Sequence, residues 1–259
     1  MVAHGQTTRP PVNRRLALIS MASAFSLLGD QVLYSVLPVY YDELGLGAIQ
    51  VGLLLSANRW IRLLTNHIAH RTVGRWPAAG LFGGALGLGA LTTLAYTATS
   101  SFTLLLAARL GWGLAWSFIR HVGVLGIMAD VSGDRVGRTM GTYNGITRVG
   151  SVAGLFGGAL LVDIVGFHSA MVVLALVSFL AVPMGFRGVS GAEIEDEPQV
   201  ASSATRLSPF EVLGVVIGAV GSGFVMATLG AVIEARLGAA APPFGLTAAT
   251  LTGGLLALR

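Results

Sequence analysis

The residues of this chain that could do chemistry are ionisable and amide side chains in the middle of long apolar stretches. The first stretch carries Asp30, and the fourth carries Arg109. The second carries Arg59, Arg62 and Asn66, whose spacings of three, four and seven residues put them on one face of a helix. Charge inside a membrane helix is costly, and by default it marks a solute pathway or a proton relay. These five residues are therefore the first candidates for a functional site.

Several arginines around one acid indicate an ion-paired cavity. Asp30 would take up a proton if its arginine partner moved away, and this would couple proton movement to a change of conformation. The surplus of positive charge suits a solute with a carboxylate, a phosphate or another anionic group, because a guanidinium is a forked and permanently charged donor. The alternative is a static pair between Asp30 and one arginine that only joins two helices. Both interpretations remain open from these residues.

Further polar side chains lie nearer the ends of the apolar stretches. Arg120 and His121 follow Arg109 in the fourth stretch, and Asn144 and Arg148 lie in the fifth. Long basic side chains at such positions can reach the interface of the bilayer, so these residues either line the cavity or extend towards water. Aromatic residues in the apolar stretches can either pack between helices or contact a solute. Among them, Tyr34 is the residue that we expect to contact the solute.

The histidines do not indicate a metal. His67 and His70 are three residues apart near the end of the second stretch, and the sequence shows no further ligands beside them. No nucleophile-and-base, phosphate-loop or redox motif appears either. We therefore expect no cofactor and no enzymatic activity.

Seven stretches are long enough to position these residues across a bilayer, since a spanning helix needs about 20 mostly apolar residues. An eighth begins at Leu246 and reaches the last residue of the chain. The seven are Leu16–Tyr41, Ala48–Ala69, Ala78–Thr99, Phe102–Met128, Thr139–Val162, Ser169–Phe186 and Phe210–Val232. The sequence predicts an all-α polytopic membrane protein with seven transmembrane helices and a truncated eighth.

Composition supports a membrane protein and excludes several other classes. Hydrophobic residues make up 54% of the chain and charged residues only 11%, against about 25% charged residues in soluble domains. There is no cysteine, which excludes disulfides and thiolate metal sites. The 36 glycines often occur four residues apart, a spacing that lets helices approach closely in lipid. The basic residues lie in short loops and within helices, so nucleic acid is not an expected partner.

Basic residues alternate between the two ends of the predicted helices. They precede the first helix and follow the second, fourth and sixth: Arg9, Arg14, Arg15, Arg71, Arg75, Arg135, Arg138, Arg187 and Arg206. Loops at the opposite end carry Asp42, Glu43 and Asp163. The positive-inside rule then predicts a cytoplasmic N-terminus in a bacterial plasma (inner) membrane.

The organisation of the chain indicates two related units. We divide it into a cytoplasmic tail (residues 1–15), a six-helix domain (16–186), a cytoplasmic linker (187–209) and the start of a second domain (210–259). The linker is polar and acidic, which is typical of a flexible segment. A shift of 200 residues aligns Leu44–Arg59 with Phe244–Arg259 and matches Arg59 with Arg259. This register predicts a repeat, and the chain is expected to be a fragment that ends inside it.

Local motifs resemble those of the major facilitator superfamily of transporters. The fourth helix reads Arg109-Leu110-Gly111-Trp112-Gly113, similar to the family's Arg-x-x-x-Gly motif. The fifth reads Gly150-Ser151-Val152-Ala153-Gly154-Leu155-Phe156-Gly157-Gly158, similar to the antiporter motif Gly-x-x-x-Gly-Pro-x-x-Gly-Gly, with Leu155 in place of proline. The loop after the second helix, His70-Arg71-Thr72-Val73-Gly74-Arg75, lacks the family's acid but keeps its final Gly-Arg.

The resemblance implies roles for these residues. It implies that Arg109 acts with Asp30 in proton coupling and that Arg59 and Arg259 face each other across a central site. It implies conformational or helix-packing roles for seven residues: Gly74, Arg75, Gly113, Gly150, Gly154, Gly157 and Gly158. It also implies alternating access, in which two six-helix halves rock around the site.

We therefore expect a proton-coupled secondary transporter, monomeric when full length, that moves a small solute through the bilayer. The Arg109 and glycine motifs favour export of drug-like compounds, and the arginines of the second helix favour an anion. Solute contacts are expected from Tyr34, Arg59, Arg62, Asn66 and Arg259. The alternative function is a non-transporting scaffold or receptor-like protein of the same fold.

Overall fold

Antiparallel helices make up the part of the chain that the computed structural model describes, which is residues 12–98, 100–129, 131, 133–192, 213, 229, 232–233, 235–236 and 247–258. Over these ranges there is no β-strand, and the all-α prediction is confirmed. The helices are α1 (Val12–Tyr40), α2 (Ala48–Thr72), α3 (Ala78–Ala98), α4 (Phe102–Met128), α5 (Arg135–Val152), the π-helix η1 (Ala153–Gly158), α6 (Ala159–Val165), α7 (Phe167–Val189) and α10 (Ala248–Ala257).

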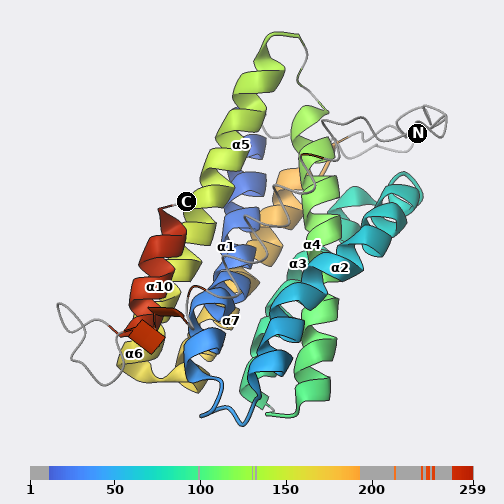
Figure 1. Cartoon of the computed structure of the whole chain (residues 1–259). Coiled ribbons are helices and arrows are strands. Elements are labelled where there is room, and N and C mark those ends of the chain that lie inside the picture. Colours follow the sequence, from blue (N-terminus) through green and yellow to red (C-terminus); the bar gives the residue numbers. More distant parts are fainter. Residues whose placement is uncertain are drawn as a thin grey trace, which may run out of the picture.

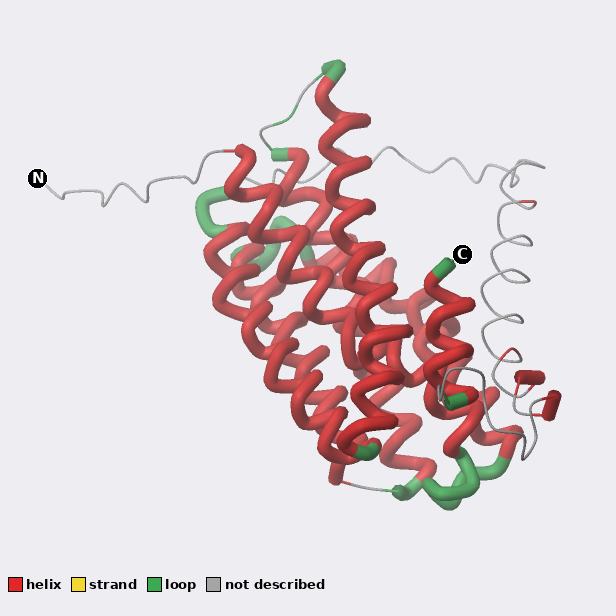
Figure 2. The backbone as a smooth tube through the Cα atoms, turned by 90° about the vertical axis from the view of Figure 1, so that its left-hand side faces the viewer, coloured by secondary structure: helices red, strands yellow, loops and turns green. Residues whose placement is uncertain are grey.

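Five helical stretches of the described chain are long and apolar enough to cross a membrane. One of them is the continuous path through α5, η1 and α6, which covers 31 residues. Figure 2 shows these helices running side by side along one direction. They confirm the expected polytopic membrane protein.

Helix α2 is long enough to span a bilayer but is less apolar than these five. Its 25 residues include Arg59, Arg62, His67, His70 and Arg71, and it is absent from the set selected by length and hydropathy together. The polar residues that make α2 a candidate for function are therefore the same residues that weaken it as an apolar span.

Helix α1 lies at the centre of the bundle (Figure 1) and packs against α2, α4, α5, η1 and α7. α3 packs on α4 and α7, and α2 packs mainly on α4. Helix α10 lies against α1, η1 and α6. α1 therefore contacts helices on several sides, and α2 is held mainly through α4.

Three glycines four residues apart bring α1 and the α5–η1 path into close contact. They face successive turns of α1: Gly150 faces Ala24, Gly154 faces Leu28 and Gly158 faces Val32. A Cβ atom on Gly154 would lie 2.8 Å from the carbonyl oxygen of Leu28, too close for any side chain. For Gly157, which is also predicted to pack, no atom of the described residues lies within 4 Å of such a Cβ atom.

Gly113 makes the same kind of contact between α4 and α2. A Cβ atom at this position would lie 2.7 Å from the carbonyl oxygen of Asn58 and 2.3 Å from a side-chain carbon of Ile61. The helices can approach this closely because glycine has no side chain. This contact holds the Arg109 turn of α4 against the middle of α2.

The two ends of the bundle differ in charge, as the alternation of loops requires. The basic end carries Arg71 in the last turn of α2, Arg75 after it, and Arg135 and Arg138 at the start of α5, all of them exposed. Gly74 turns the chain here with a φ of 86°, a left-handed conformation that favours glycine. The opposite end, called the acidic end below, carries the α1–α2 loop and the end of α6.

Several predicted boundaries move in the structure. The predicted tail ends at residue 15, but α1 already begins at Val12. The predicted linker begins at residue 187, but α7 continues to Val189. Residues 193–209 of that linker and most of the predicted seventh helix lie outside the described residues. α10 begins at Ala248, 200 residues after the start of α2 at Ala48.

Candidate functional site

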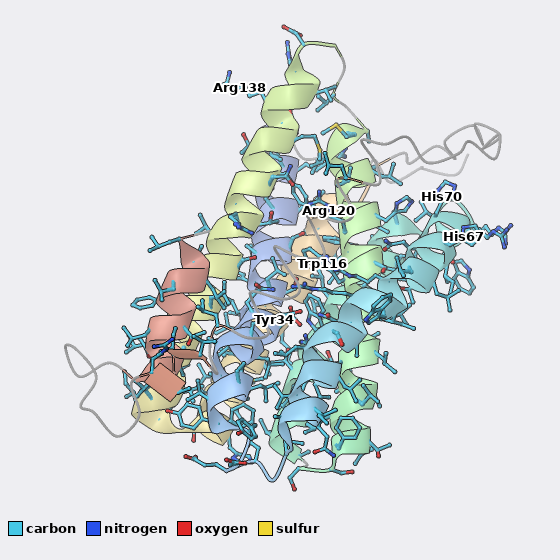
Figure 3. The ribbon with its side chains drawn as sticks, in the orientation of Figure 1. Tyr34, His67, His70, Trp116, Arg120 and Arg138 are labelled. Carbon is cyan, nitrogen blue, oxygen red and sulfur yellow. The ribbon has the colours of Figure 1, made fainter. Side chains whose placement is uncertain are left out.

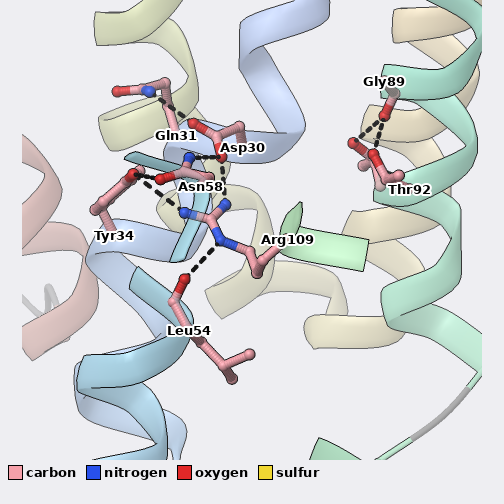
Figure 4. Close-up of polar contacts among 9 residues, drawn as sticks. Asp30, Gln31, Tyr34, Leu54, Asn58, Gly89, Thr92 and Arg109 are labelled. Carbon is pink, nitrogen blue, oxygen red and sulfur yellow. Dashed lines mark hydrogen bonds and ion pairs between the residues drawn. The ribbon is translucent and has the colours of Figure 1, made fainter. Parts of the chain in front are cut away.

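Arg109 of α4 is fully buried in the middle of the bundle, and its guanidinium contacts two other helices, α1 and α2. Its Nη1 donates to Asp30 Oδ1 in an ion pair, and its Nη2 donates to the hydroxyl of Tyr34 at 3.1 Å. Its Nε donates to the backbone carbonyl of Leu54 at 3.0 Å. Figure 4 shows this guanidinium between α1 and α2. The predicted pairing of Asp30 with an intramembrane arginine is thus present, and the partner is Arg109.

Asp30 receives two further hydrogen bonds from amide side chains. Asn58 Nδ2 donates to Oδ1 at 3.2 Å, and Gln31 Nε2 donates to Oδ2 at 3.0 Å. Tyr34 closes the ring, since its hydroxyl donates to Asn58 Oδ1 at 3.2 Å. We call Asp30, Gln31, Tyr34, Asn58 and Arg109 the central network. Both carboxylate oxygens are occupied, as a charge at 2% exposure requires.

The central network lies against a cavity of about 440 Å³. Most of the residues that line the cavity lie three or four positions apart on their helix, so they share the helix face that is turned towards the cavity. α1 supplies Leu27, Asp30, Gln31 and Tyr34; α2 supplies Asn58, Arg59 and Arg62; α4 supplies Trp112 and Trp116; α5 and η1 supply Asn144, Thr147, Arg148, Ser151, Val152 and Leu155; and α10 supplies Leu256. A cavity of this size suits a small organic solute.

Two of the predicted solute-binding arginines enter the cavity from α2, and the structure brings Tyr34 to them. The guanidinium carbon of Arg59 lies 5.5 Å from the centre of the Tyr34 ring. Arg62 lies one turn further along α2 and is half-buried, and its Nε has no hydrogen-bond partner among the described residues. Arg148 enters from α5 and is exposed. Figure 3 shows Tyr34 and Trp116 in the middle of the bundle.

One predicted solute-binding residue of the described chain, Asn66, does not line this cavity. It is exposed, although it shares a helix face with the arginines. One further turn carries Asn66 towards the basic end, beyond the cavity. Arg259 lies outside the described residues.

The polar residues nearer the basic end form contacts of their own. Arg120 donates to Asn144 Oδ1 at 3.0 Å and lies over the Tyr143 ring, which joins α4 to α5. His70 and His121 meet edge to face, with ring centres 5.5 Å apart. His67 and His70 lie at the far end of α2 (Figure 3). Among the described residues no group of side chains could hold a metal ion.

A second acid is held at the acidic end of the bundle. Asp163 in α6 accepts hydrogen bonds from three hydroxyls: Tyr40 in α1 at 3.0 Å, Thr247 at the start of α10 at 2.7 Å, and Thr250 in α10. We call Asp163, Tyr40, Thr247 and Thr250 the Asp163 cluster. It joins α1 and α6 to α10 at the end opposite the basic loops.

The π-helix lies where the fifth-helix motif departs from the family pattern. Leu155 is in the middle of η1, and its backbone carbonyl accepts a hydrogen bond from the hydroxyl of Ser35 at 2.9 Å. The same carbonyl faces Gly253 of α10, where a Cβ atom would lie 2.0 Å from it. The widened turn therefore presents its backbone to both α1 and α10.

Sequence reasoning missed Asn58, Gln31 and the Asp163 cluster. Asn58 precedes Arg59 and lies four residues before Arg62, so its place on the cavity side of α2 was available from spacing alone. Asp163 was assigned only to a loop. Its partners come from two other helices, α1 and α10, and no local pattern joins them.

Comparison with known proteins gives one family. The chain matches the family model described as Major Facilitator Superfamily over residues 19–258. No curated protein matches the chain. The matched range covers most of the sequence and includes both the central network and the Asp163 cluster. The chain therefore belongs to the major facilitator superfamily, a family of membrane transporters.

Proposed function

We propose that this protein is a proton-coupled secondary transporter that moves a small solute, drug-like or anionic, by alternating access. The observation that carries the proposal is the buried pair of Asp30 and Arg109 in the wall of the central cavity. A family member with a cavity of this size and a carboxylate in its wall has the parts that coupling requires. Asp30 and Arg109 serve proton coupling in this proposal, and Tyr34, Arg59 and Arg62 contact the solute.

Proton uptake by Asp30 would change the central network in a defined way. A neutral carboxyl group no longer compensates the charge of Arg109, which is fully buried. An uncompensated buried charge is strongly unfavourable, so Arg109 would seek another anion or a more hydrated position. Because Arg109 also contacts Leu54 and Tyr34, its movement would loosen α4 from α1 and α2. Protonation would thereby change the conformation around the cavity.

Alternating access requires that the two units of the chain move relative to one another. We propose units of residues 16–186 and 210–259, joined by a linker of residues 187–209. α10 belongs to the second unit and is held to the first by the Asp163 cluster. Opening of the cavity at the acidic end would have to break these hydrogen bonds.

The proposed orientation has the basic end in the cytoplasm of a bacterial cell and the acidic end outside the inner membrane. The supporting observation is that the end of α2 and the start of α5 lie at the same end of the bundle (Figure 1), and these segments carry Arg71, Arg75, Arg135 and Arg138. The glycine series of α5 and η1, which resembles the antiporter motif, favours exchange of solute for protons. We propose that the transporter acts as a monomer.

The proposal can be tested with proteoliposomes that contain the full-length protein and the pH-sensitive dye pyranine. A gradient of a transported solute should change the internal pH. The panel would include benzenesulfonate, ethidium and tetraphenylphosphonium, so that anions and drug-like cations are both represented. Asp30→Asn should abolish the pH change but leave solute binding intact, because asparagine keeps the shape of the side chain but cannot carry the proton.

The matched control is Asp134→Asn, an exposed acid at the start of α5, which should leave the pH change unaltered. If no solute of the panel moves protons, the proposed function is wrong. If Asp30→Asn retains full proton movement, the coupling role of Asp30 is wrong, and its pair with Arg109 only joins helices.

A further inference from the structure

The charges in the cavity wall are out of balance in favour of cations. Arg59, Arg62 and Arg148 line the cavity, and Asp30 is the one carboxylate among its described lining residues. Asp30 does not offset these arginines, because it is already paired with Arg109, which lies behind the wall. The guanidinium groups of Arg62 and Arg148 therefore face a cavity whose one described carboxylate is already paired elsewhere.

Two further polar side chains in the wall, Asn144 and Arg62, keep hydrogen-bond donors for a solute, whereas the amide nitrogens of Gln31 and Asn58 already donate to Asp30. Asn144 uses its carbonyl to accept from Arg120, so its amide nitrogen remains as a donor. The Nε of Arg62 has no acceptor among the residues that the structure describes. A wall of donors is complementary to a solute that brings acceptors.

The positions of the arginines suit an oxyanion with several oxygens. Arg62 enters from α2 and Arg148 from α5, so two different helices present guanidinium groups to the same space. A guanidinium fork pairs well with two oxygens of one anionic group. A carboxylate, sulfonate or phosphonate has this geometry, whereas a cation or a neutral amide does not.

The remainder of the wall is apolar and indicates an organic body on the solute. Trp112 and Trp116 are stacked with ring centres 5.5 Å apart, and Leu27, Val152 and Leu256 lie around the same cavity. The volume of about 440 Å³ is far larger than an inorganic anion needs. The apolar residues would bury an aromatic or aliphatic group next to the arginines.

We propose that the solute is an organic anion whose oxyanion group is bound between Arg62 and Arg148 and whose apolar body packs beside Trp116. This inference rests on the proposed function, since it names the class of solute that the central cavity takes. It separates the anionic from the drug-like cationic alternative.

Equilibrium binding to the full-length protein in lipid nanodiscs tests the proposal by isothermal titration calorimetry. Benzenesulfonate, benzenesulfonamide and phenyltrimethylammonium share an aromatic ring and differ in charge. Benzenesulfonate should bind at least about tenfold more tightly than the other two, and also more tightly than inorganic sulfate. Equal or weaker binding of benzenesulfonate overturns the anion assignment. Equal binding of sulfate overturns the apolar part of the proposal.

Variants identify the arginines that hold the anion. Arg62→Gln should weaken benzenesulfonate binding by about 10- to 100-fold, the usual range for loss of a hydrogen bond to a charged group. Arg148→Gln, at an exposed position, should weaken it by up to about fivefold. Arg138→Gln is the matched control. Arg138 lies on α5, as Arg148 does, but at the exposed end of that helix and away from the cavity (Figure 3). A loss in Arg138→Gln equal to that in Arg62→Gln overturns the site.

The binding and proton-flux measurements test the solute class and the coupling proposal separately. If benzenesulfonate binds as expected but moves no protons, the solute class stands and the coupling proposal is wrong. If ethidium moves protons and benzenesulfonate does not bind, the coupling proposal stands and the solute class is wrong.

Discussion

Two acids, Asp30 and Asp163, are buried or half-buried in the part of the chain that the structure describes, and the molecule satisfies them by different means. Asp30 is paired with a guanidinium and two side-chain amides in the middle of the bundle. Asp163 is surrounded by three hydroxyl donors at the acidic end. A guanidinium neutralises a carboxylate, whereas hydroxyls only solvate it. The first arrangement therefore depends strongly on charge, and the second depends on the number and direction of its donors.

The helices that the two acids join also differ. The central network connects α1, α2 and α4, which all belong to the proposed six-helix unit. The Asp163 cluster connects α1 and α6 to α10, which follows the proposed linker. Relative movement of the two proposed units would leave the central network whole but would break the cluster. Under the proposed function, the central network therefore responds to protons and the Asp163 cluster responds to conformation.

The largest expected effect is that of removing the cation from the central network. Arg109→Gln leaves the Asp30 carboxylate buried without its counter-charge, which should lower the free energy of unfolding by about 3–5 kcal/mol. Thermal unfolding in detergent, followed by circular dichroism, measures this loss. The double variant Asp30→Asn/Arg109→Gln should recover most of the stability, since neither charge remains. A double variant as unstable as Arg109→Gln would mean that packing rather than charge holds this network.

Much of the central network was predictable because its chemistry is visible in single residues. An acid and several arginines inside apolar stretches are rare, and helical spacing puts Arg59 and Arg62 on one face. Their partners were harder to predict, because the choice of Arg109 over Arg59 as the partner of Asp30 depends on how closely α4 approaches α1 and α2. Gly113 permits that approach to α2, but a sequence does not show against which helix a glycine packs.

The Asp163 cluster was not predictable for a related reason. Tyr40, Thr247 and Thr250 are ordinary residues for helix ends, and more than 80 positions separate Asp163 from either threonine. Asn66 shows the opposite failure, since helical spacing alone placed it with Arg59 and Arg62 although the cavity ends before its turn. Periodicity predicts the face of a helix but not how far along that face a cavity extends.

A smaller effect should follow from disturbing the contact that supports the central network. In Gly154→Ala the new Cβ atom would lie 2.8 Å from the Cβ atom of Gln31, which holds Asp30. Overpacking of this kind costs about 1–3 kcal/mol. Both thermal stability and proton flux should fall. Gly157→Ala is the matched control, because a Cβ atom there meets nothing within 4 Å. Equal losses in the two variants would contradict the assigned contact between η1 and α1.

The Asp163 cluster should respond through conformation more than through overall stability. Asp163→Asn keeps one acceptor oxygen but loses the charge, at a cost of about 1–2 kcal/mol for the contact of α10 with α1 and α6. The chain contains no cysteine, so a single Ala249→Cys substitution reports this contact without background. Ala249 is fully buried at the start of α10. Its labelling by a maleimide should accelerate about 5- to 30-fold in Asp163→Asn.

The control for this measurement is Asp42→Asn, an exposed acid at the same end of the bundle. Its labelling rate should equal that of the parent. An unchanged rate in Asp163→Asn as well would show that apolar packing, and not the cluster, holds α10 in place.

The smallest expected effect comes from removing one hydroxyl from the cluster. Tyr40→Phe deletes a single donor to Asp163 and leaves both threonines, so it should cost about 0.6 kcal/mol and raise the Ala249→Cys labelling rate about threefold. Tyr34→Phe is the corresponding change in the central network, where the hydroxyl both accepts from Arg109 and donates to Asn58. Its loss leaves a buried charged donor with one partner fewer, so it should reduce thermal stability more than Tyr40→Phe and leave the labelling rate unchanged. Labelling that rises equally in both variants would mean that the two acids belong to one coupled unit, and the distinction between a proton-responsive site and a conformational contact would then fail.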